Sequence, residues 1–297
     1  MRAVRSALGQ SRVQLEVLIV DDGSTDATEL LVSEIPDPRV RYLKRPVSGG
    51  VSAARNTGIS EARGRWIAFL DDDDVWAPTK LVRGIDVMVA NGGTWSYAGD
   101  VMVDGDLNIL AGAPPPPPGE VVRLLERHNS VPAGASNVIV AADALAVAGT
   151  FDPQLTNNED WDMWIRLARA GPPDWVCRPL VAISYHERNA SREMDTMIRQ
   201  LDVVAARYGI RVDRARHYRW AAWHALLEGR RGDATRNYAR AVAAGDVMSL
   251  ARAAVAILRP DHAVRRAQRK EQGSGPDPWI AEARRWLDPL AQAERRP

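Results

Sequence analysis

The chain has 297 residues, of which 45% are hydrophobic and 26% are charged, and its formal net charge is +1. This charge balance argues against a general nucleic-acid binder, and a single cysteine, Cys177, excludes an intrachain disulfide scaffold. No run of 18 apolar residues predicts a membrane span, and the first 14 residues lack the apolar centre of a secretory signal. We therefore expect a cytoplasmic globular protein with one large α/β domain and an additional unit.

Apolar runs alternate with helical stretches over the first 70 residues. The predicted helices cover 2–10, 27–33 and 51–62, and the predicted strands cover 15–20, 40–43 and 66–70. The continuous apolar run at 15–20 is typical of a parallel strand buried on both faces. We expect Ser24 or Thr25 to cap the helix that follows it. The alternation predicts βαβ units in a mostly parallel sheet with flanking helices.

The pattern between residues 94 and 186 is less regular. Strands are predicted at 97–103, 107–110, 137–141 and 176–186, and helices at 120–127 and 159–170. Five consecutive prolines at 114–118 predict an extended surface loop. In the helix 159–170, one face carries Trp161, Trp164, Ile165 and Ala168.

Strand patterns disappear beyond residue 191. Helices are predicted at 218–228, 233–244, 248–258 and 279–290, and the texture of 232–241 resembles one tetratricopeptide repeat. We divide the chain into an α/β domain (1–195), a helical appendage (196–262), and a basic linker with a terminal amphipathic helix (263–297).

The helical part carries an excess of positive charge. Between residues 211 and 270 there are 14 Lys and Arg against 5 Asp and Glu. One interpretation is peripheral contact with the inner face of an anionic membrane. The other, which we favour, is a helical cap whose arginines extend over apolar surface into water.

Acidic clusters follow two of the predicted strands. Asp21 and Asp22 end one strand, and the run 71–74 is four consecutive aspartates at the end of another. Ligands of open α/β sheets bind at the carboxyl ends of strands, and clustered carboxylates favour a hard cation such as Mg²⁺ or Mn²⁺ with phosphate. The alternative is a solvated acidic loop.

A glycine pair lies between these two clusters. Gly49 and Gly50 precede a helix, where backbone N–H groups could face an anion, and Arg55 adds a fixed positive charge. This pattern favours a diphosphate flanked by a metal ion, although an arginine on a helix is more often a surface residue.

A third acidic pair, Glu159 and Asp160, opens the tryptophan-bearing helix. Carboxylates in a first helical turn commonly complement the helix dipole. The functional interpretation is a general base at the mouth of a site, with Trp161 supporting the face of a sugar.

Four motifs occur in a fixed order along the chain. They are Val-Asp-Asp-Gly-Ser-Thr-Asp at 20–26, Gly-Val-Ser-Ala-Ala-Arg-Asn at 50–56, Phe-Leu-Asp-Asp-Asp-Asp-Val-Trp at 69–76, and Asn-Glu-Asp-Trp-Asp at 158–162. With them, residues 1–191 resemble the family 2 glycosyltransferases of the GT-A fold. The resemblance implies inverting transfer from a nucleotide-diphospho-sugar to a carbohydrate, lipid-linked or small-molecule acceptor, with Mn²⁺ or Mg²⁺ as cofactor.

The resemblance also implies roles for individual residues. It places Asp22 at the nucleotide base, Arg55 near base and phosphate, and Asp71, Asp72 and Asp73 in the D-x-D motif, with Asp72 near the ribose. Asp73, together with Asp71, is then the candidate metal ligand. Asp160 corresponds to the catalytic base, with Glu159 beside it. His186 corresponds to a histidine that some members use near metal or diphosphate, and an ordinary polar rim position is its alternative.

The sequence departs from the family pattern at its start. Members normally begin with an apolar strand that ends in a Pro-Thr-Tyr-Asn-like turn, and this sequence opens on the helix that follows such a strand. We therefore expect the first strand of the sheet and some base and ribose contacts to be missing. A catalytically impaired nucleotide-sugar-binding relative and a sugar-nucleotide nucleotidyltransferase remain as alternatives. We expect acceptor specificity to depend on residues 114–118, residues 130–137 and the helical appendage.

Overall fold

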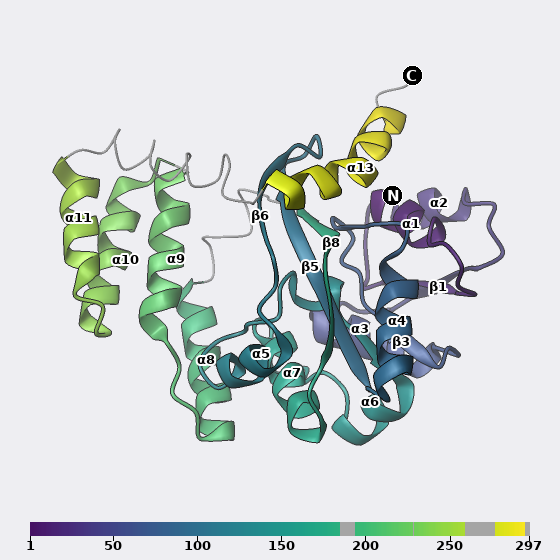
Figure 1. Cartoon of the computed structure of the whole chain (residues 1–297), viewed down its shortest axis with the longest axis horizontal. Helices are drawn as coiled ribbons and strands as arrows, with labels where there is room; N and C mark the ends of the chain where they lie inside the picture. Colours follow the sequence, from purple (N-terminus) through teal and green to yellow (C-terminus); the bar gives the residue numbers. More distant parts are fainter. Residues whose placement is uncertain (185–193, 228, 259–276, 295–297) are drawn as a thin grey trace.

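The computed structural model describes residues 1–184, 194–227, 229–258 and 277–294. A mixed sheet with helices around it occupies the middle of the molecule, and a stack of helices stands at one end (Figure 1). Within these ranges no helix combines the length and the apolar character that crossing a bilayer requires.

The central sheet has six strands, in the order β3-β7-β5-β8-β4, with β6 paired to β5. Their bounds are β3 Trp66–Ala68, β4 Val75–Trp76, β5 Trp95–Val103, β6 Ile109–Ala113, β7 Ile139–Ala141 and β8 Asp174–Ser184. In this sheet only β5 and β8 are parallel, and the other pairs are antiparallel. The predicted mostly parallel sheet is therefore wrong in detail, because the tight turn after β5 makes a hairpin with β6 and β7 returns against β3 and β5.

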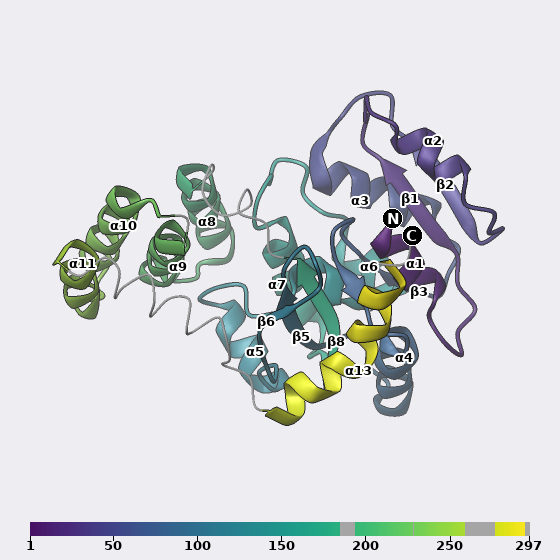
Figure 2. The same ribbon diagram turned by 90° about the horizontal axis from the view of Figure 1, so that it is seen from above.

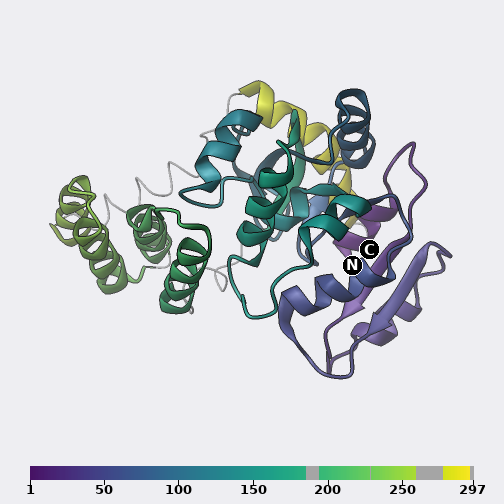
Figure 3. The same ribbon diagram turned by 90° about the horizontal axis from the view of Figure 1, so that it is seen from below.

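The first two strands form a separate sheet. β1 (Val17–Asp21) and β2 (Val40–Lys44) are parallel, joined through α2 (Thr28–Ser33), and the views from above and below place them with α2 at the end opposite α11 (Figures 2 and 3). Burial of β1 on both faces was expected, but four of its five residues are only partly buried, because the sheet has just two strands. The expected cap is also absent: the N-cap residue of α2 is Ala27, not Ser24 or Thr25, and the Asp26 carboxylate accepts the Thr28 N–H at 3.0 Å.

Helices pack around both sheets. They are α1 Arg2–Leu8, α3 Gly50–Glu61, α4 Lys80–Asn91, α5 Pro118–Leu125, the 3₁₀ turn η1 Gly134–Asn137, α6 Ala142–Ala148 and α7 Glu159–Ala170. The predicted helix at 159–170 is confirmed, and its Trp161, Trp164 and Ile165 lie in the main apolar core. Because α7 buries this face against the sheet and α5, its first turn is fixed in position.

The helical part begins with a helix that the sequence did not predict. α8 (Met194–Tyr208) places Leu201 and Val204, both fully buried, in the same core as Trp164. The remaining helices stack beside it as α9 (Arg214–Leu227), α10 (Arg231–Ala243) and α11 (Met248–Leu258) (Figure 1). α8 is thus continuous with the core of the α/β unit.

The last helix returns to the central sheet. In α13 (Asp277–Glu294), Trp279 lies over Gly99 and Gly112, where an added Cβ would come within 2.3 Å and 3.2 Å of its indole ring. The Trp279 indole N–H donates to the carbonyl of Asp100 at 3.1 Å. Glycine at these two positions therefore lets a tryptophan from the far end of the chain pack directly on β5 and β6.

Candidate functional site

The side chain of Arg55 joins three of the four motifs. Its Nη1 lies 2.7 Å from Glu159 Oε1, and its Nη2 lies 2.8 Å from Asp71 Oδ1. The arginine side chain is only 11% exposed. A guanidinium that is almost buried and paired with two carboxylates holds α3, the segment after β3 and the first turn of α7 together.

Backbone contacts hold α3 in the orientation that this arginine requires. Ser52 donates to the carbonyl of Leu155 at 3.0 Å. Asn56 donates to the carbonyl of Phe151 and accepts its N–H, both at 2.8 Å. Ser52, Arg55 and Asn56 follow the i, i+3, i+4 spacing of one helix face, so the whole face is directed at the residues that lead into α7.

Asp22 caps α3 from a distant part of the chain. Its carboxylate accepts the N–H groups of Gly49 (3.0 Å) and Gly50 (2.8 Å) and the Ser48 hydroxyl (2.8 Å), and it pairs with Arg45 at 2.7 Å. Burial works to raise the pKa of Asp22, but these hydrogen bonds lower it below its ordinary value. The two glycine amides therefore face Asp22, and the prediction that they face an anionic ligand is wrong for this structure. Gly50, whose N–H Asp22 accepts, precedes Arg55 by five residues, or about 7.5 Å along the α3 axis at 1.5 Å per residue.

The four aspartates after β3, residues 71–74, differ in their contacts and in their exposure to solvent. Asp71 faces Arg55, and its N–H donates to Ser136 Oγ at 3.0 Å. Asp74 is buried and accepts the Ser184 N–H at 3.0 Å, and burial raises its pKa to about 7. Asp72 is exposed and Asp73 is partly exposed. The mutual repulsion of the run is thus reduced by one arginine and by the preference of Asp74 for its neutral form.

No three His, Cys, Asp or Glu side chains in the described part of the chain converge into a site that could hold a metal ion. Of the predicted ligands, Asp71 already pairs with Arg55, and Asp73 lies beside it in the acidic run. His186 lies outside the described residues. The carboxylates of Asp71 and Asp73 fit an ion that is held by one or two protein carboxylates together with ligand oxygens, which is how Mg²⁺ is usually bound.

Glu159 and Asp160 differ in their surroundings. Glu159 is buried, and burial and the neighbouring charge of Asp160 raise its pKa to about 7, against the opposing effect of Arg55. Asp160 is partly exposed, and its pKa is also raised by burial while Arg55 acts to lower it. Its Oδ1 accepts the Trp161 N–H at 2.7 Å, and its Oδ2 accepts Asn129 Nδ2 at 2.7 Å. Asp160 is therefore the more accessible member of the pair, and its pKa is raised above its ordinary value.

Trp161 cannot support a sugar. Its side chain is fully buried, and its indole N–H donates to the carbonyl of Leu125 at 2.9 Å. The expectation that Trp161 faces a ligand is therefore wrong, because this residue lies on the apolar face that α7 turns toward α5.

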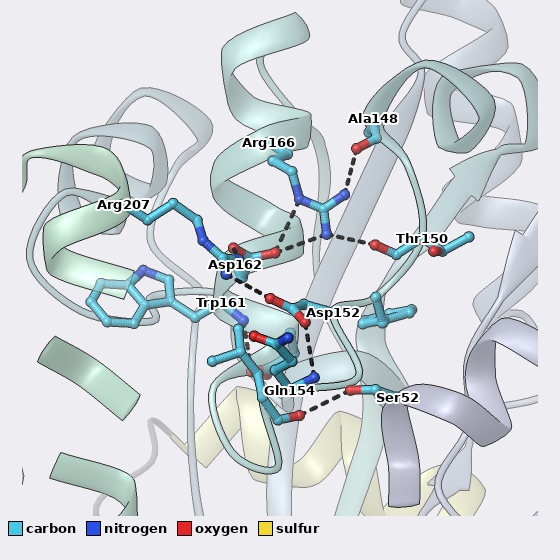
Figure 4. A network of polar contacts seen from close by, with 12 residues as sticks. Ser52, Ala148, Thr150, Asp152, Gln154, Trp161, Asp162, Arg166 and Arg207 are labelled. Atoms are coloured by element: carbon cyan, nitrogen blue, oxygen red, sulfur yellow. Dashed lines mark hydrogen bonds and ion pairs between the residues drawn. The ribbon is translucent and has the colours of Figure 1, made fainter. Parts of the chain in front are cut away.

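Asp162, the last residue of the fourth motif, has a structural role (Figure 4). Its buried carboxylate accepts Arg166 Nε at 3.0 Å, Arg207 Nη1 at 2.6 Å and the Tyr208 hydroxyl at 2.7 Å. Arg207 also pairs with Asp152 at 2.6 Å. This network joins α7, α8 and the loop before α7, and so fixes the helix whose first turn carries Asp160.

The segment 129–137 belongs to the site. The sequence analysis linked residues 130–137 to acceptor specificity, but it did not predict their contacts with Asp71 and Asp160. Ser136 accepts the Asp71 N–H, and its carbonyl accepts the Trp76 indole N–H at 2.6 Å. Gly134 has a φ of +51°, and a Cβ added there would lie 3.1 Å from Asp160 Oδ2. Asn129 binds the same oxygen. Local sequence gives no signal for these roles, since the segment has the composition of an ordinary loop.

Comparison with known proteins gives consistent results. Residues 1–103 match the profile of glycosyl transferase family 2. The succinoglycan biosynthesis protein ExoO of Rhizobium meliloti is 54% identical over 86 residues, which are 29% of this chain and 25% of ExoO. The Escherichia coli UDP-Glc:alpha-D-GlcNAc-diphosphoundecaprenol beta-1,3-glucosyltransferase WfaP is 32% identical over 168 residues, which are 57% of this chain and 64% of WfaP. The chain thus spans between a quarter and two thirds of these relatives.

Solved structures with the same fold include S. aureus TarS 1-349 in complex with UDP-GlcNAc. It superposes with a TM-score of 0.57 and 15% sequence identity, over 90% of this chain and 86% of that one. The full-length S. aureus TarS structure gives a TM-score of 0.55 at 14% identity, over 91% of this chain and 52% of that one. The fold is therefore that of the GT-A glycosyltransferases, as the sequence predicted.

Asp74 should make the free energy of unfolding depend on pH. Its carboxyl pKa is about 7 in the folded chain against an ordinary value of 3.8. The folded state therefore binds this proton more tightly, so the resulting stability is present below pH 4 and is lost as the pH rises through 7. The full difference is roughly 4 kcal/mol. In Asp74→Asn this part of the pH dependence should disappear, as measured by urea unfolding at pH 5 and pH 8 with EDTA present.

The matched control is Asp72→Asn, which changes an exposed neighbour in the same run. This variant should keep the pH dependence of the parent chain. An Asp74→Asn variant whose unfolding free energy changes with pH as much as the parent's would contradict the assignment.

Proposed function

We propose that the chain transfers a sugar, with inversion, from a nucleotide-diphospho-sugar to an acceptor hydroxyl, and the match of residues 1–103 to glycosyl transferase family 2 supports this proposal. The observation that carries this proposal is the double ion pair of Arg55, which brings the acidic run and the Glu159–Asp160 pair to one place. Relatives and structural neighbours whose names include UDP-glucose and UDP-GlcNAc support a UDP-linked hexose as donor.

Asp160 is the proposed general base. Its carboxylate takes the proton of the acceptor hydroxyl while that oxygen forms a bond to the anomeric carbon. The bond between the anomeric carbon and the diphosphate oxygen breaks, and its electrons leave with the nucleoside diphosphate. Glu159, buried and paired with Arg55, supports the base by fixing the first turn of α7.

The donor side of the site is proposed to comprise Asp22, Arg55, Asp71 and Asp72. Asp72 is exposed and so available to a ribose, whereas Asp22 and Asp71 are already held by neighbouring groups. We therefore propose that Asp22 and Arg55 form part of the nucleotide site. Asp22 would do so at the N-terminal end of α3, and Arg55 on one face of this helix.

A divalent cation, Mn²⁺ or Mg²⁺, is proposed to bind together with the donor. Asp73, with Asp71, would hold it, and His186 is the third candidate ligand. Such an ion stabilises the negative charge that develops on the departing diphosphate. With one or two carboxylates from the chain, such an ion would take further oxygen ligands from the diphosphate.

The acceptor is proposed to be a lipid-linked sugar, as the name of WfaP states for that enzyme. Contact with a membrane surface follows from such an acceptor. Leu250, Ala251 and Ala254 are exposed apolar residues of α11, and Val247, which directly precedes this helix, is exposed as well. An exposed apolar stripe on the outermost helix of a basic stack supports peripheral binding to anionic lipid.

Replacing the proposed base should greatly lower turnover and leave donor binding intact. Asp160→Asn keeps the size of the side chain but removes its capacity to accept a proton, so kcat should fall roughly 10²- to 10⁴-fold. UDP release would be measured with UDP-glucose and UDP-GlcNAc and a GlcNAc-diphospholipid acceptor, and donor affinity by calorimetry. Asp143→Asn, an exposed first-turn aspartate of α6, is the matched control.

Two results would contradict the assignment of the chain as a glycosyltransferase. Tight donor binding without turnover in the parent chain would favour the non-catalytic relative. Pyrophosphate release from a nucleoside triphosphate and a sugar phosphate would favour the nucleotidyltransferase.

The cation should bind strongly only when the nucleotide is present. Titration of Mn²⁺ into the chain alone should give weak binding, whereas Mn²⁺ should increase the affinity for UDP. Asp73→Asn should remove most of that increase, and Asp143→Asn should retain it. Equal UDP affinity in Mn²⁺ and in EDTA for the parent chain would argue against a cation in this site.

Membrane contact should depend on the apolar stripe of α11. The chain should co-sediment with anionic phospholipid vesicles at low salt and less at high salt. Leu250→Glu should reduce this binding, because it places a negative charge in the stripe. Val89→Glu changes an equally exposed apolar residue on α4 and should have no effect. Failure of the parent chain to bind vesicles would favour the helical cap.

A further inference from the structure

Among the described residues, Asp160 receives one side-chain hydrogen bond from outside its own helix. Its Oδ1 is bound locally by the N–H of Trp161, which follows it in α7. Its Oδ2 accepts Asn129 Nδ2 at 2.7 Å, across 31 residues of sequence. The contact with Asn129 is therefore the one that fixes the carboxylate relative to another part of the fold.

The orientation of the Asn129 amide is set by a second contact. Its Oδ1 accepts the N–H of Val131 at 3.3 Å, which leaves Nδ2 as the atom directed at Asp160. An amide in this orientation can only donate to Asp160, and a donated hydrogen bond favours the ionised form of a carboxylate.

The loop that carries Asn129 is itself held from three sides. Ser130 donates to the carbonyl of Val121 in α5 at 3.0 Å. The carbonyl of Arg127 accepts the N–H of Asp213, just before α9, at 3.0 Å. The Trp161 indole donates to Leu125 at the end of α5. Asn129 therefore approaches Asp160 from a position that α5, α7 and α9 define together.

We propose that Asn129 is a positioning residue for the general base, which it holds in the rotamer that takes the acceptor proton. This inference rests on the proposed role of Asp160. A carboxylate has about four acceptor positions, and Asn129 and the Trp161 N–H occupy two of them. The two remaining lone pairs, one on each oxygen, are then held in fixed directions, from which the acceptor hydroxyl must approach.

Several charged groups act on the same carboxylate and must be separated from the effect of Asn129. Arg55 on α3 favours its ionised form, whereas Asp71 after β3 and Glu159 in its own helix oppose it. Asn129, in contrast, is a neutral side chain that donates a hydrogen bond to this carboxylate. A substitution at 129 therefore changes the hydrogen bond without removing any of these charges.

Two variants test the proposal. Asn129→Asp has nearly the same shape but cannot donate when ionised and adds a negative charge. Asn129→Ala removes the side chain beyond Cβ. Both should lower kcat at pH 6.5 roughly 10- to 100-fold, the range expected for a hydrogen bond to a charged group. Both should also move the acidic limb of the kcat profile to higher pH, and Asn129→Asp should move it further.

The control is Ser130→Ala, which loosens the same loop without touching Asp160. It should leave the pH profile in place, and donor affinity should be unchanged in all three variants. Thermal unfolding identifies any variant that fails to fold, and the isosteric Asn129→Asp keeps the test valid if the alanine variant does.

The outcomes separate this inference from the proposed function. If Asp160→Asn retains turnover, the role of Asp160 fails and the positioning role fails with it. If Asp160→Asn is inactive while Asn129→Asp keeps the parent's kcat and pH profile within twofold, only the role of Asn129 is overturned. A profile shifted equally by Ser130→Ala would assign the effect to the loop as a whole and would also overturn it.

Discussion

The site depends on one nearly buried guanidinium. Arg55 reaches a carboxylate 16 residues away in the sequence and another 104 residues away. A buried ion is stable only with partners, and removing one partner of such a set leaves an uncompensated charge inside the protein. The acidic run after β3 and the first turn of α7 therefore depend on the same side chain. If either segment moved away from α3, the buried guanidinium would lose one of its two carboxylate partners.

The segment 129–137 is a second connection between the same two motifs. Its Ser136 holds the backbone of Asp71, while its Asn129 and Gly134 approach Asp160 Oδ2. One connection is ionic and passes through α3, and the other is made of neutral hydrogen bonds and backbone. Because the two connections are independent, the carboxylates are held in place before any ligand arrives, which is the form of preorganisation that electrostatic catalysis requires.

The sequence predicts those features that adjacent residues determine, and it does not predict contacts between distant segments. α7 was predicted at its observed bounds because its apolar face and the glycine after it are properties of adjacent residues. The mixed sheet was not predictable, since β3, β4 and β7 have two or three residues each and acquire their direction from their partners. Likewise, the capping of α3 by Asp22 and the roles of Asn129 and Ser136 are contacts between distant segments that no local pattern carries.

The helical part, which the sequence suggests is a separate appendage, supports the site through α8 and the segment that leads into α9. α8 fills the core with Leu201 and Val204, and its Arg207 binds the buried Asp162 of α7. The segment entering α9 holds the loop of Asn129 through Asp213. Two successive helices thus fix, respectively, the helix that carries Asp160 and the loop that orients it. A change in how these helices pack would therefore reach the carboxylate through two routes, without any contact between the helices and the reacting atoms.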